Sequence, residues 1–231
     1  MRGLFVTGTD TGVGKSVVAA AICASLRDRG ERVAAFKPAV TGLDEPPGEW
    51  PQDHRLLAAV ANAGQTPEDV APYRFGPAIS PHHAAERAGT ALEPGLIIAA
   101  AAQAAASADV LVVEGVGGVL VPLGPAYSVR DLAVELGLSM VVASRPGLGT
   151  INHTLLTLEA LRAAVLEVTE IVLTPWPESP TRLERANRRS LERLSGVPVT
   201  AMPFTSPESL AAAGDVLVST AARTEALPAS A

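Results

Sequence analysis

Short apolar runs alternate along this chain with longer amphipathic or alanine-rich stretches. The runs have the length of strands, and the stretches between them are long enough for helices. The run at residues 109–113 shows no regular alternation of polar and apolar positions, which predicts a strand buried on both faces. Strands are predicted at residues 4–6, 33–36, 109–113, 139–143, 170–173 and 199–203.

The predicted helices begin and end at residues that commonly cap helices. Ser80 stands before Pro81, and Ser128 opens an amphipathic stretch. Gly30 and Gly137 follow stretches that they would end. Helices are expected to start at residues 17 and 81, and to cover residues 53–60, 94–107, 128–136, 155–164, 182–194 and 208–221. Proline-rich loops are expected at 43–52 and 65–79, and an extended segment at 119–123.

This alternation predicts an α/β fold with a mostly parallel sheet and helices on both faces. We expect one domain over residues 1–225 and a disordered tail over 226–231. Of the 231 residues 48% are hydrophobic and only 3% are aromatic, so the core is expected to consist of Ala, Val and Leu.

The charge pattern argues against nucleic acid as a partner, because the net charge is −6 and no basic block occurs. Cys23 is the only cysteine, which excludes an intrachain disulfide and fits a reducing compartment. The N-terminus carries no secretion signal, and the longest apolar stretches are interrupted by polar residues. The sequence therefore predicts a cytoplasmic protein without a membrane span.

A glycine loop between the first strand and the first helix is the main chemical motif. It reads Gly-Thr-Asp-Thr-Gly-Val-Gly-Lys-Ser over residues 8–16. Such a loop directs backbone N–H groups and the positive end of a helix dipole at a phosphate. Lys15 would reach the outer phosphates, and the Ser16 hydroxyl would bind Mg²⁺. The strict pattern has Gly at position 9, where this chain has Thr9.

Lys37 follows the second predicted strand, and Thr41 and Gly42 lie in the same loop. Ligands of open α/β sheets bind at the carboxyl ends of the strands, which makes Lys37 a candidate site cation as well as an ordinary loop lysine. Asp53 opens the next helix pattern. Either it caps that helix or it binds Mg²⁺, and the sequence alone leaves both interpretations open.

A second carboxylate, Glu114, ends the strand at 109–113 and precedes the glycine-rich residues 115–118. P-loop proteins carry a second Mg²⁺-binding acid at this place, although a turn with an incidental glutamate has the same pattern. Gly115 and Gly117 would let the backbone approach a ligand or the first loop. Residues 149–152, which are Gly-Thr-Ile-Asn, are either a second anion cradle or an ordinary helix start.

Two further segments are candidates for ligand contact. Residues 174–177 form a proline-containing loop that could flank a nucleotide base. His82 and His83 are adjacent in a helix pattern, so their side chains diverge and rarely bind one metal ion. Packing of that helix start near the site, or binding of an anion there, is the preferred interpretation.

Taken together, these segments resemble the dethiobiotin synthetase family of biotin biosynthesis. The resemblance spans most of the chain and rests on residues 8–16, Lys37-Pro38 with Thr41-Gly42, Ser80-Pro81-His82, residues 114–118 and residues 149–153. It implies an ATP- and Mg²⁺-dependent ligase that joins 7,8-diaminononanoate and CO2 or bicarbonate. The diamine forms a carbamate, the γ-phosphate activates it as a mixed anhydride, and the second amine closes the ring.

The resemblance also implies roles for individual residues. Lys15 and Lys37 would neutralise charge on the γ-phosphate and the carbamate. Mg²⁺ would be held by Ser16, Asp53 and Glu114. The nucleotide would be contacted by Thr11, Gly12, Val13, Gly14, Lys15, Ser16, Val17, Asp53, Glu114, Gly115, Val116, Gly117, Thr174, Pro175 and Pro203. The substrate would be contacted by Lys37, Thr41, Gly149, Thr150, Ile151 and Asn152, the last four across a homodimer interface.

Three departures from the family pattern and two alternatives remain. Ser16 and Thr41 replace a usual Thr and a usual Ser, and residues 174–176 lack the Asn-Asp that many members carry near the base. Another nucleoside triphosphate could therefore replace ATP. The alternatives are a P-loop amidoligase of the cobyrinate type and a partitioning-type ATPase switch. The first usually carries a glutaminase domain, and the second usually has a lysine where Asp10 stands.

Overall fold

The computed structural model describes residues 2–46 and 48–225, and beyond residue 217 it describes the backbone alone. Its centre is a six-stranded sheet in which every pairing is parallel, as the sequence predicts. The strand order is β10-β9-β8-β1-β5-β2. The strands are β1 (Gly3–Gly8), β2 (Val33–Phe36), β5 (Val110–Glu114), β8 (Ser139–Ser144), β9 (Val168–Trp176) and β10 (Val199–Pro203).

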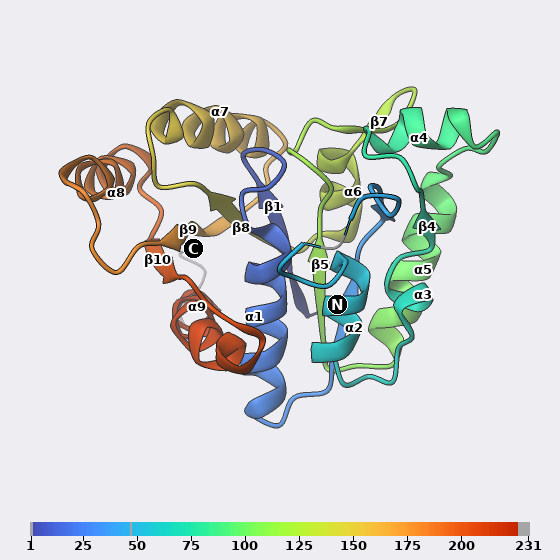
Figure 1. The fold of residues 1–231 in the computed structure, drawn as a ribbon, viewed down its shortest axis with the longest axis horizontal. Helices are drawn as coiled ribbons and strands as arrows, with labels where there is room; N and C mark the ends of the chain where they lie inside the picture. Colours follow the sequence, from blue (N-terminus) through green and yellow to red (C-terminus); the bar gives the residue numbers. More distant parts are fainter. Residues whose placement is uncertain (1, 47, 226–231) are drawn as a thin grey trace, which may run out of the picture.

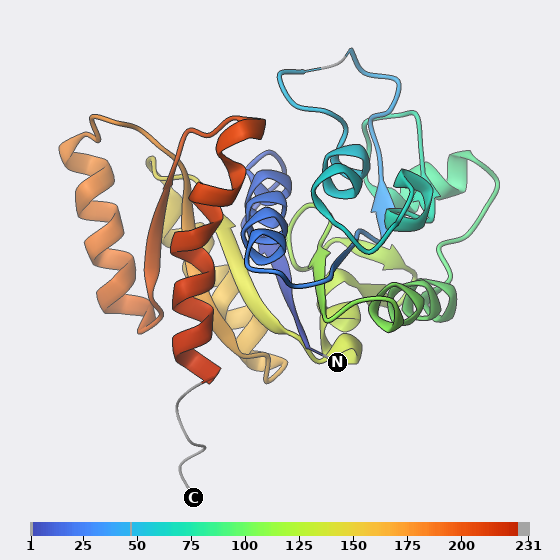
Figure 2. The same ribbon diagram turned by 90° about the horizontal axis from the view of Figure 1, so that it is seen from below.

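Helices cover both faces of this sheet (Figures 1 and 2). One face packs against α1 (Lys15–Asp28), α2 (Asp53–Val60), α3 (Pro67–Val70) and α9 (Leu210–Glu225). The other face packs against α4 (Pro81–Arg87), α5 (Pro94–Ala106), α6 (Val129–Leu136), α7 (Thr150–Ala163) and α8 (Arg182–Ser195). No helix among the described residues has both the length and the apolar character needed to cross a bilayer.

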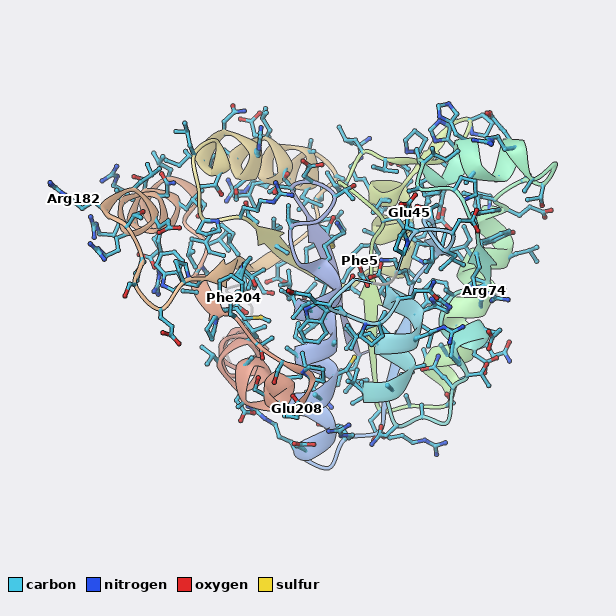
Figure 3. The ribbon with its side chains drawn as sticks, in the orientation of Figure 1. Phe5, Glu45, Arg74, Arg182, Phe204 and Glu208 are labelled. Atoms are coloured by element: carbon cyan, nitrogen blue, oxygen red, sulfur yellow. The ribbon has the colours of Figure 1, made fainter. Side chains whose placement is uncertain are left out.

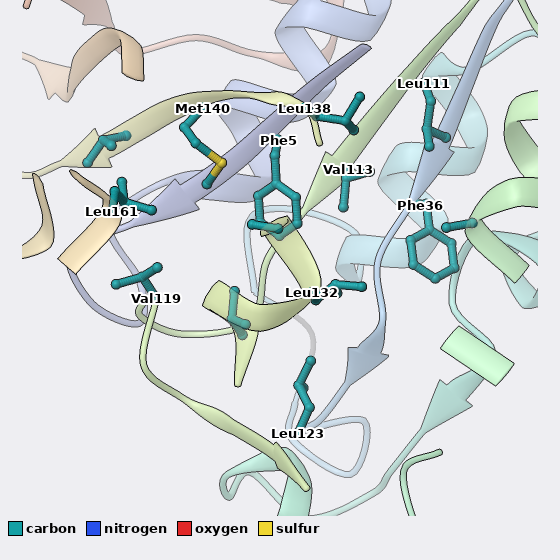
Figure 4. Close-up of a cluster of buried hydrophobic side chains, with 14 of the residues drawn as sticks. Phe5, Phe36, Leu111, Val113, Val119, Leu123, Leu132, Leu138, Met140 and Leu161 are labelled. Atoms are coloured by element: carbon teal, nitrogen blue, oxygen red, sulfur yellow. The ribbon is translucent and has the colours of Figure 1, made fainter. Parts of the chain in front are cut away.

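Successive strand residues point into opposite layers, which explains why the buried strands are apolar without alternation. On β1, Phe5 belongs to the core beside α5 and α6, whereas Val6 belongs to the core beside α1. Phe5, Phe36 and Met140 lie in the first of these cores (Figure 4). The second core is rich in Ala and Val, so α1 approaches the sheet and α9 closely.

Gly214 marks the closest approach of α9 to α1. A Cβ atom built on Gly214 would lie 2.0 Å from the backbone oxygen of Ala21. Ser25 also donates a hydrogen bond of 2.6 Å to the Asp215 carboxylate. The C-terminal helix is therefore fitted against the helix that follows the glycine loop.

Two small sheets lie outside the central one. Ala39–Val40 (β3) pairs in parallel with Tyr73–Arg74 (β4). Pro122–Gly124 (β6) pairs with Tyr127–Ser128 (β7) in antiparallel orientation. The extended segment expected at 119–123 is thus wrong in its first half, because residues 119–120 form a turn and the strand begins at Pro122.

Most predicted elements agree with the structure to within one or two residues. The loop expected at 65–79 is wrong in part, because it contains α3 and β4, and three further boundaries were also wrong. Helix α7 begins at Thr150, directly after Gly149, and not at residue 155. Strand β9 continues to Trp176, because pairing with β10 extends it through Thr174 and Pro175. Those residues are therefore strand and not loop. Helix α9 runs to Glu225 after a 3-10 turn at Pro207–Ser209, and the predicted disordered tail lies outside the described residues.

Candidate active site

The carboxyl ends of β1, β2 and β5 meet at one edge of the sheet, and a cavity of ≈ 640 Å³ opens there. Its lining brings together charged side chains from four separate parts of the chain, namely Lys15, Lys37, Asp53 and Glu114. The other lining residues are Thr11, Gly12, Gly14, Ser16, Val17, Ala39, Thr41, Trp50, Leu56, Ala78, Ile79, Ser80, Pro81, Val116, Gly117 and Val121.

The glycine loop between β1 and α1 forms one wall of this cavity. Gly12 and Gly14 have φ angles of 70° and 91°, a backbone region that favours glycine. At Gly14 space is also limiting, because a built Cβ would lie 2.7 Å from Cγ2 of Thr174. Helix α1 begins at Lys15, so its first N–H groups face the cavity end of the loop.

Lys15 is buried at the end of this loop. Its Nζ donates a hydrogen bond of 2.7 Å to the backbone oxygen of Asp10. Burial, with a contribution from the Lys37 charge, lowers the pKa of Lys15 to about 8, although Glu114 and Asp53 oppose the shift. Among the described residues, Lys15 forms no ion pair with a carboxylate, and an anion beside it would stabilise its charged form.

Lys37 is held between two carboxylates. Its Nζ lies 2.6 Å from Oδ2 of Asp53 and 2.5 Å from Oε1 of Glu114. Burial alone would lower the pKa of Lys37, but the two carboxylates outweigh it and raise that pKa above its ordinary value. Lys37 is therefore a permanently charged donor at the floor of the cavity.

The two carboxylates differ in their surroundings. Glu114 is fully buried, and burial raises its pKa, with the nearby Asp53 charge adding to the effect. Asp53 sits at the cavity rim, where Lys37 overcomes partial burial and lowers its pKa. Asp53 is the first residue of α2 and Gln52 is the cap, so the interpretation of Asp53 as an N-cap was wrong.

The oxygen atoms here suit a hard cation such as Mg²⁺. Ser16 Oγ lies 2.8 Å from Oε1 of Glu114, while the buried Oε2 has no hydrogen-bond partner in the described structure. No group of three or more His, Cys, Asp or Glu side chains among the described residues could hold a metal alone. Mg²⁺ commonly binds one or two carboxylates and completes its shell with phosphate oxygens and water, so the donors fit.

Most of the other predicted residues near the glycine loop line the cavity, but two do not. Thr11, Gly12, Gly14, Val17, Thr41, Val116 and Gly117 line the cavity. Within the described structure Val13 and Gly115 do not line it, because Val13 is buried in the core beside α1 and Gly115 packs against Phe5 and Val129. Gly117 both lines the cavity and approaches the first loop, with a built Cβ 3.6 Å from the hydroxyl of Thr11.

Two predicted regions lie outside the cavity lining that the described residues provide. Thr174, Pro175 and Pro203 are at the carboxyl ends of β9 and β10, where the Thr174 side chain lies against Gly14 of the glycine loop. Phe204, which is 73% exposed, follows them (Figure 3). Residues 149–152 start α7, and the hydroxyl of Thr150 lies 2.8 Å from that of Ser144. Their assigned roles stay predictions.

Several residues that line the cavity were not predicted as site residues from the sequence. Leu56 lies one helical turn after Asp53, so the two share a face of α2, and this spacing was a usable signal. Trp50 comes from the proline-rich loop that precedes α2, and only its rarity in this chain marks it. Ser80 and Pro81 line the cavity as the helix start expected near the site.

Comparisons with known proteins agree with this picture. The family model described as an AAA domain matches residues 2–203. A protein named ATP-dependent dethiobiotin synthetase from Anaeromyxobacter is 43% identical over 85% of this chain and 86% of its own length. Proteins of the same name from Mycobacterium avium and Bacillus subtilis are 41% and 34% identical, over 92% and 86% of this chain and 91% and 85% of their own lengths.

Solved structures support the fold alone. A McdA–ATP complex from Cyanothece aligns with a TM-score of 0.56 over 100% of this chain and 99% of its own, at 10% sequence identity. Such low identity says nothing about substrate. The curated relatives share a third or more of their residues with this chain along most of their length. The chain belongs to the dethiobiotin synthetase family.

Proposed function

We propose that this protein is an ATP-dependent dethiobiotin synthetase, a ligase that forms two C–N bonds around one carbon atom. The observation that carries the proposal is the convergence of Lys15, Lys37 and Glu114 on one cavity beside a phosphate-type loop. The names of the curated relatives point to ATP and dethiobiotin. The family resemblance implies the rest of the reaction, in which 7,8-diaminononanoate, CO2 or bicarbonate and ATP give dethiobiotin, ADP and phosphate.

The charges of the cavity suit a polyphosphate with a divalent cation. Lys15 and Lys37 are balanced by Asp53 and Glu114, so the four groups sum to zero. Mg²⁺ held by Ser16, Asp53 and Glu114 would make the site net positive and would screen the charge of the phosphates. We infer that the loop residues 11–17 bind the phosphates through their N–H groups.

The chemistry needs little covalent help from the protein. One amine of the substrate adds to CO2 and loses a proton, which gives a carbamate. The carbamate oxygen attacks the γ-phosphorus, the bond to the β-phosphate oxygen breaks, and ADP leaves. The second amine then attacks the carbamate carbon and phosphate leaves as the ring closes. Lys37 would stabilise the carbamate oxygens and Lys15 the γ-phosphate, which is catalysis by positioning and electrostatics.

The polar and apolar walls of the cavity fit a diamine with an alkyl chain. Thr41 and Ser80 provide hydroxyl groups, and Trp50, Leu56 and Ile79 provide apolar surface. We further propose that the protein acts in the cytoplasm as a homodimer, with residues 149–152 of a second copy binding the substrate carboxylate. We treat residues 1–225 as one functional domain.

The test is incubation of the purified protein with the diamine, bicarbonate, Mg²⁺ and each of several nucleoside triphosphates, with dethiobiotin detected by mass. We expect product that depends on all four components. Phosphate release without the diamine, at an equal rate, would favour the ATPase-switch alternative. Product with ATP but not with CTP or GTP would show that the base is selected in the absence of the usual Asn-Asp.

A further inference from the structure

We propose that Arg145 is a positioning residue that fixes the glycine loop in its anion-binding conformation. The proposal rests on the proposed function in one respect, which is that residues 11–17 bind nucleotide phosphates. Arg145 follows β8 directly, and β8 is the neighbour of β1 in the sheet. Arg145 therefore lies at the end of the strand next to β1, beside the glycine loop.

The Arg145 side chain contacts the backbone of the loop. Nη2 donates to the backbone oxygen of Thr11 at 3.3 Å and to that of Gly12 at 3.4 Å. A Cβ built on Gly12 would lie 3.3 Å from the same nitrogen, so the guanidinium group lies against this glycine. The contacts join residues more than 130 positions apart, as the two hydrogen bonds span 134 and 133 residues.

These contacts determine where two loop N–H groups point. A trans peptide unit is planar, with its C=O and N–H directed to opposite sides. The oxygen of Thr11 shares a peptide unit with the N–H of Gly12, and the oxygen of Gly12 shares one with the N–H of Val13. Holding both oxygens on the Arg145 side therefore turns both N–H groups away from it, toward the phosphate side of the loop.

The end of β8 supports the start of the loop as well. The N–H of Thr9 donates to the backbone oxygen of Ala143 at 3.0 Å, and the Thr9 hydroxyl donates to that of Ser144 at 3.3 Å. Three successive residues of the β8 end thus hold the loop at separate points. Arg145 is the one of the three that reaches the glycine turn itself.

The charged group of Arg145 has loop carbonyl oxygens as hydrogen-bond partners. In the part of the chain that the structure describes, it makes no ion pair with a carboxylate. A guanidinium group on a carbonyl oxygen polarises the peptide unit and makes its N–H a better donor. Arg145 therefore both orients and strengthens the donors, without itself touching the phosphates.

The first experiment measures equilibrium binding of ATP and of inorganic tripolyphosphate, each with Mg²⁺, to Arg145→Ala. Loss of a charge-assisted hydrogen bond predicts about a 10-fold weaker affinity for both ligands, since the base plays no part. Arg145→Lys should recover only part of the loss, because an ammonium lacks the planar fork of a guanidinium. The matched control is Arg189→Ala on α8, an exposed arginine whose loss should leave both affinities unchanged.

The second experiment measures backbone hydrogen exchange in the intact protein without nucleotide, and follows the proteolytic fragment that covers residues 9–16. Faster exchange in Arg145→Ala than in the parent protein is expected, together with an unchanged melting temperature. Unchanged exchange, unchanged tripolyphosphate affinity, or full recovery by Arg145→Lys would each overturn the positioning role. The parent protein separates the two proposals: if its affinity for tripolyphosphate falls on Arg145→Ala substitution as expected but it makes no dethiobiotin, the proposed function fails and this inference stands.

Discussion

The ammonium group of Lys37 lies 2.5 Å from the carboxylate of Glu114, and both groups are enclosed by protein. The two residues are 77 positions apart. They meet because Phe36 of β2 is the register partner of Val113 of β5, so each charged residue comes one position after a paired residue. A buried ion pair of this kind is costly to break from one side.

Replacing Lys37 by alanine should abolish synthesis while nucleotide binding stays measurable. We expect turnover to fall at least about 10²–10³-fold, because one electrostatic contact to the reacting groups is lost. Dethiobiotin formation and nucleotide titration are measured on the same sample, and retained binding shows that the variant is folded. Full activity in Lys37→Ala would rule out the role of Lys37.

Glu114→Gln should raise the Mg²⁺ concentration needed for half-maximal rate by about 10-fold, because an amide oxygen is a weaker ligand than a carboxylate. The variant keeps the shape of the side chain, so a Mg²⁺ titration of the rate isolates the charge. An identical titration curve for variant and parent would contradict the assignment of Glu114 to the metal.

The value of kcat/KM for the nucleotide should fall as the pH rises above about 8, since only protonated Lys15 attracts phosphate and its pKa is about 8. Fold stability should respond in the opposite direction. A lysine whose pKa is lowered in the folded state destabilises the fold while it is charged, and this cost disappears as the pH rises from about 8 toward the ordinary value of 10.5.

The control for this pH profile is Lys15→Arg, because a guanidinium group does not titrate in that range. Whatever activity it keeps should lack the alkaline decline, measured as kcat/KM from pH 6 to pH 10. A decline with the same midpoint in Lys15→Arg would mean that another group titrates.

Gly214→Ala should lower the free energy of unfolding by about 1–3 kcal/mol, because its methyl group would meet the backbone oxygen of Ala21 at 2.0 Å and the helices must separate. Gly95→Ala on α5 is the matched control. A built Cβ there has no neighbour within 4 Å, so the change should be neutral or stabilising by about 0.5 kcal/mol. Denaturant unfolding of both variants checks this, and equal effects would refute the close approach of α9 and α1.

Much of the central sheet could be predicted because its strands are short apolar runs ended by glycine, proline or a charged residue. The glycine loop and Glu114 were predictable for the same reason, since the loop begins at the last residue of β1 and Glu114 is the last residue of β5. Helix α7 was placed five residues late because Thr150 and Asn152 have low helix propensity, whereas Gly149 and the hydroxyl of Ser144 fix its start.

Other features depend on contacts that local sequence cannot reveal. Pro175 indicated the end of a strand, but pairing with β10 continues β9 through this residue. The contact of Arg145 with Thr11 and Gly12 depends on β8 being the neighbour of β1, which is a property of strand order. Strand order, and with it the set of residues that share a cavity, is decided by how the layers pack.

The strand order β1-β5-β2 has a consequence for how this site tolerates change. Hydrogen-bonded strands lie about 4.8 Å apart, and the residues after their ends inherit this lateral spacing. The separation of the reactive groups is therefore set by backbone pairing and not by the connecting segments. Insertions between residues 43 and 52 should alter which molecules can enter, and leave the spacing of Lys37 and Glu114 intact.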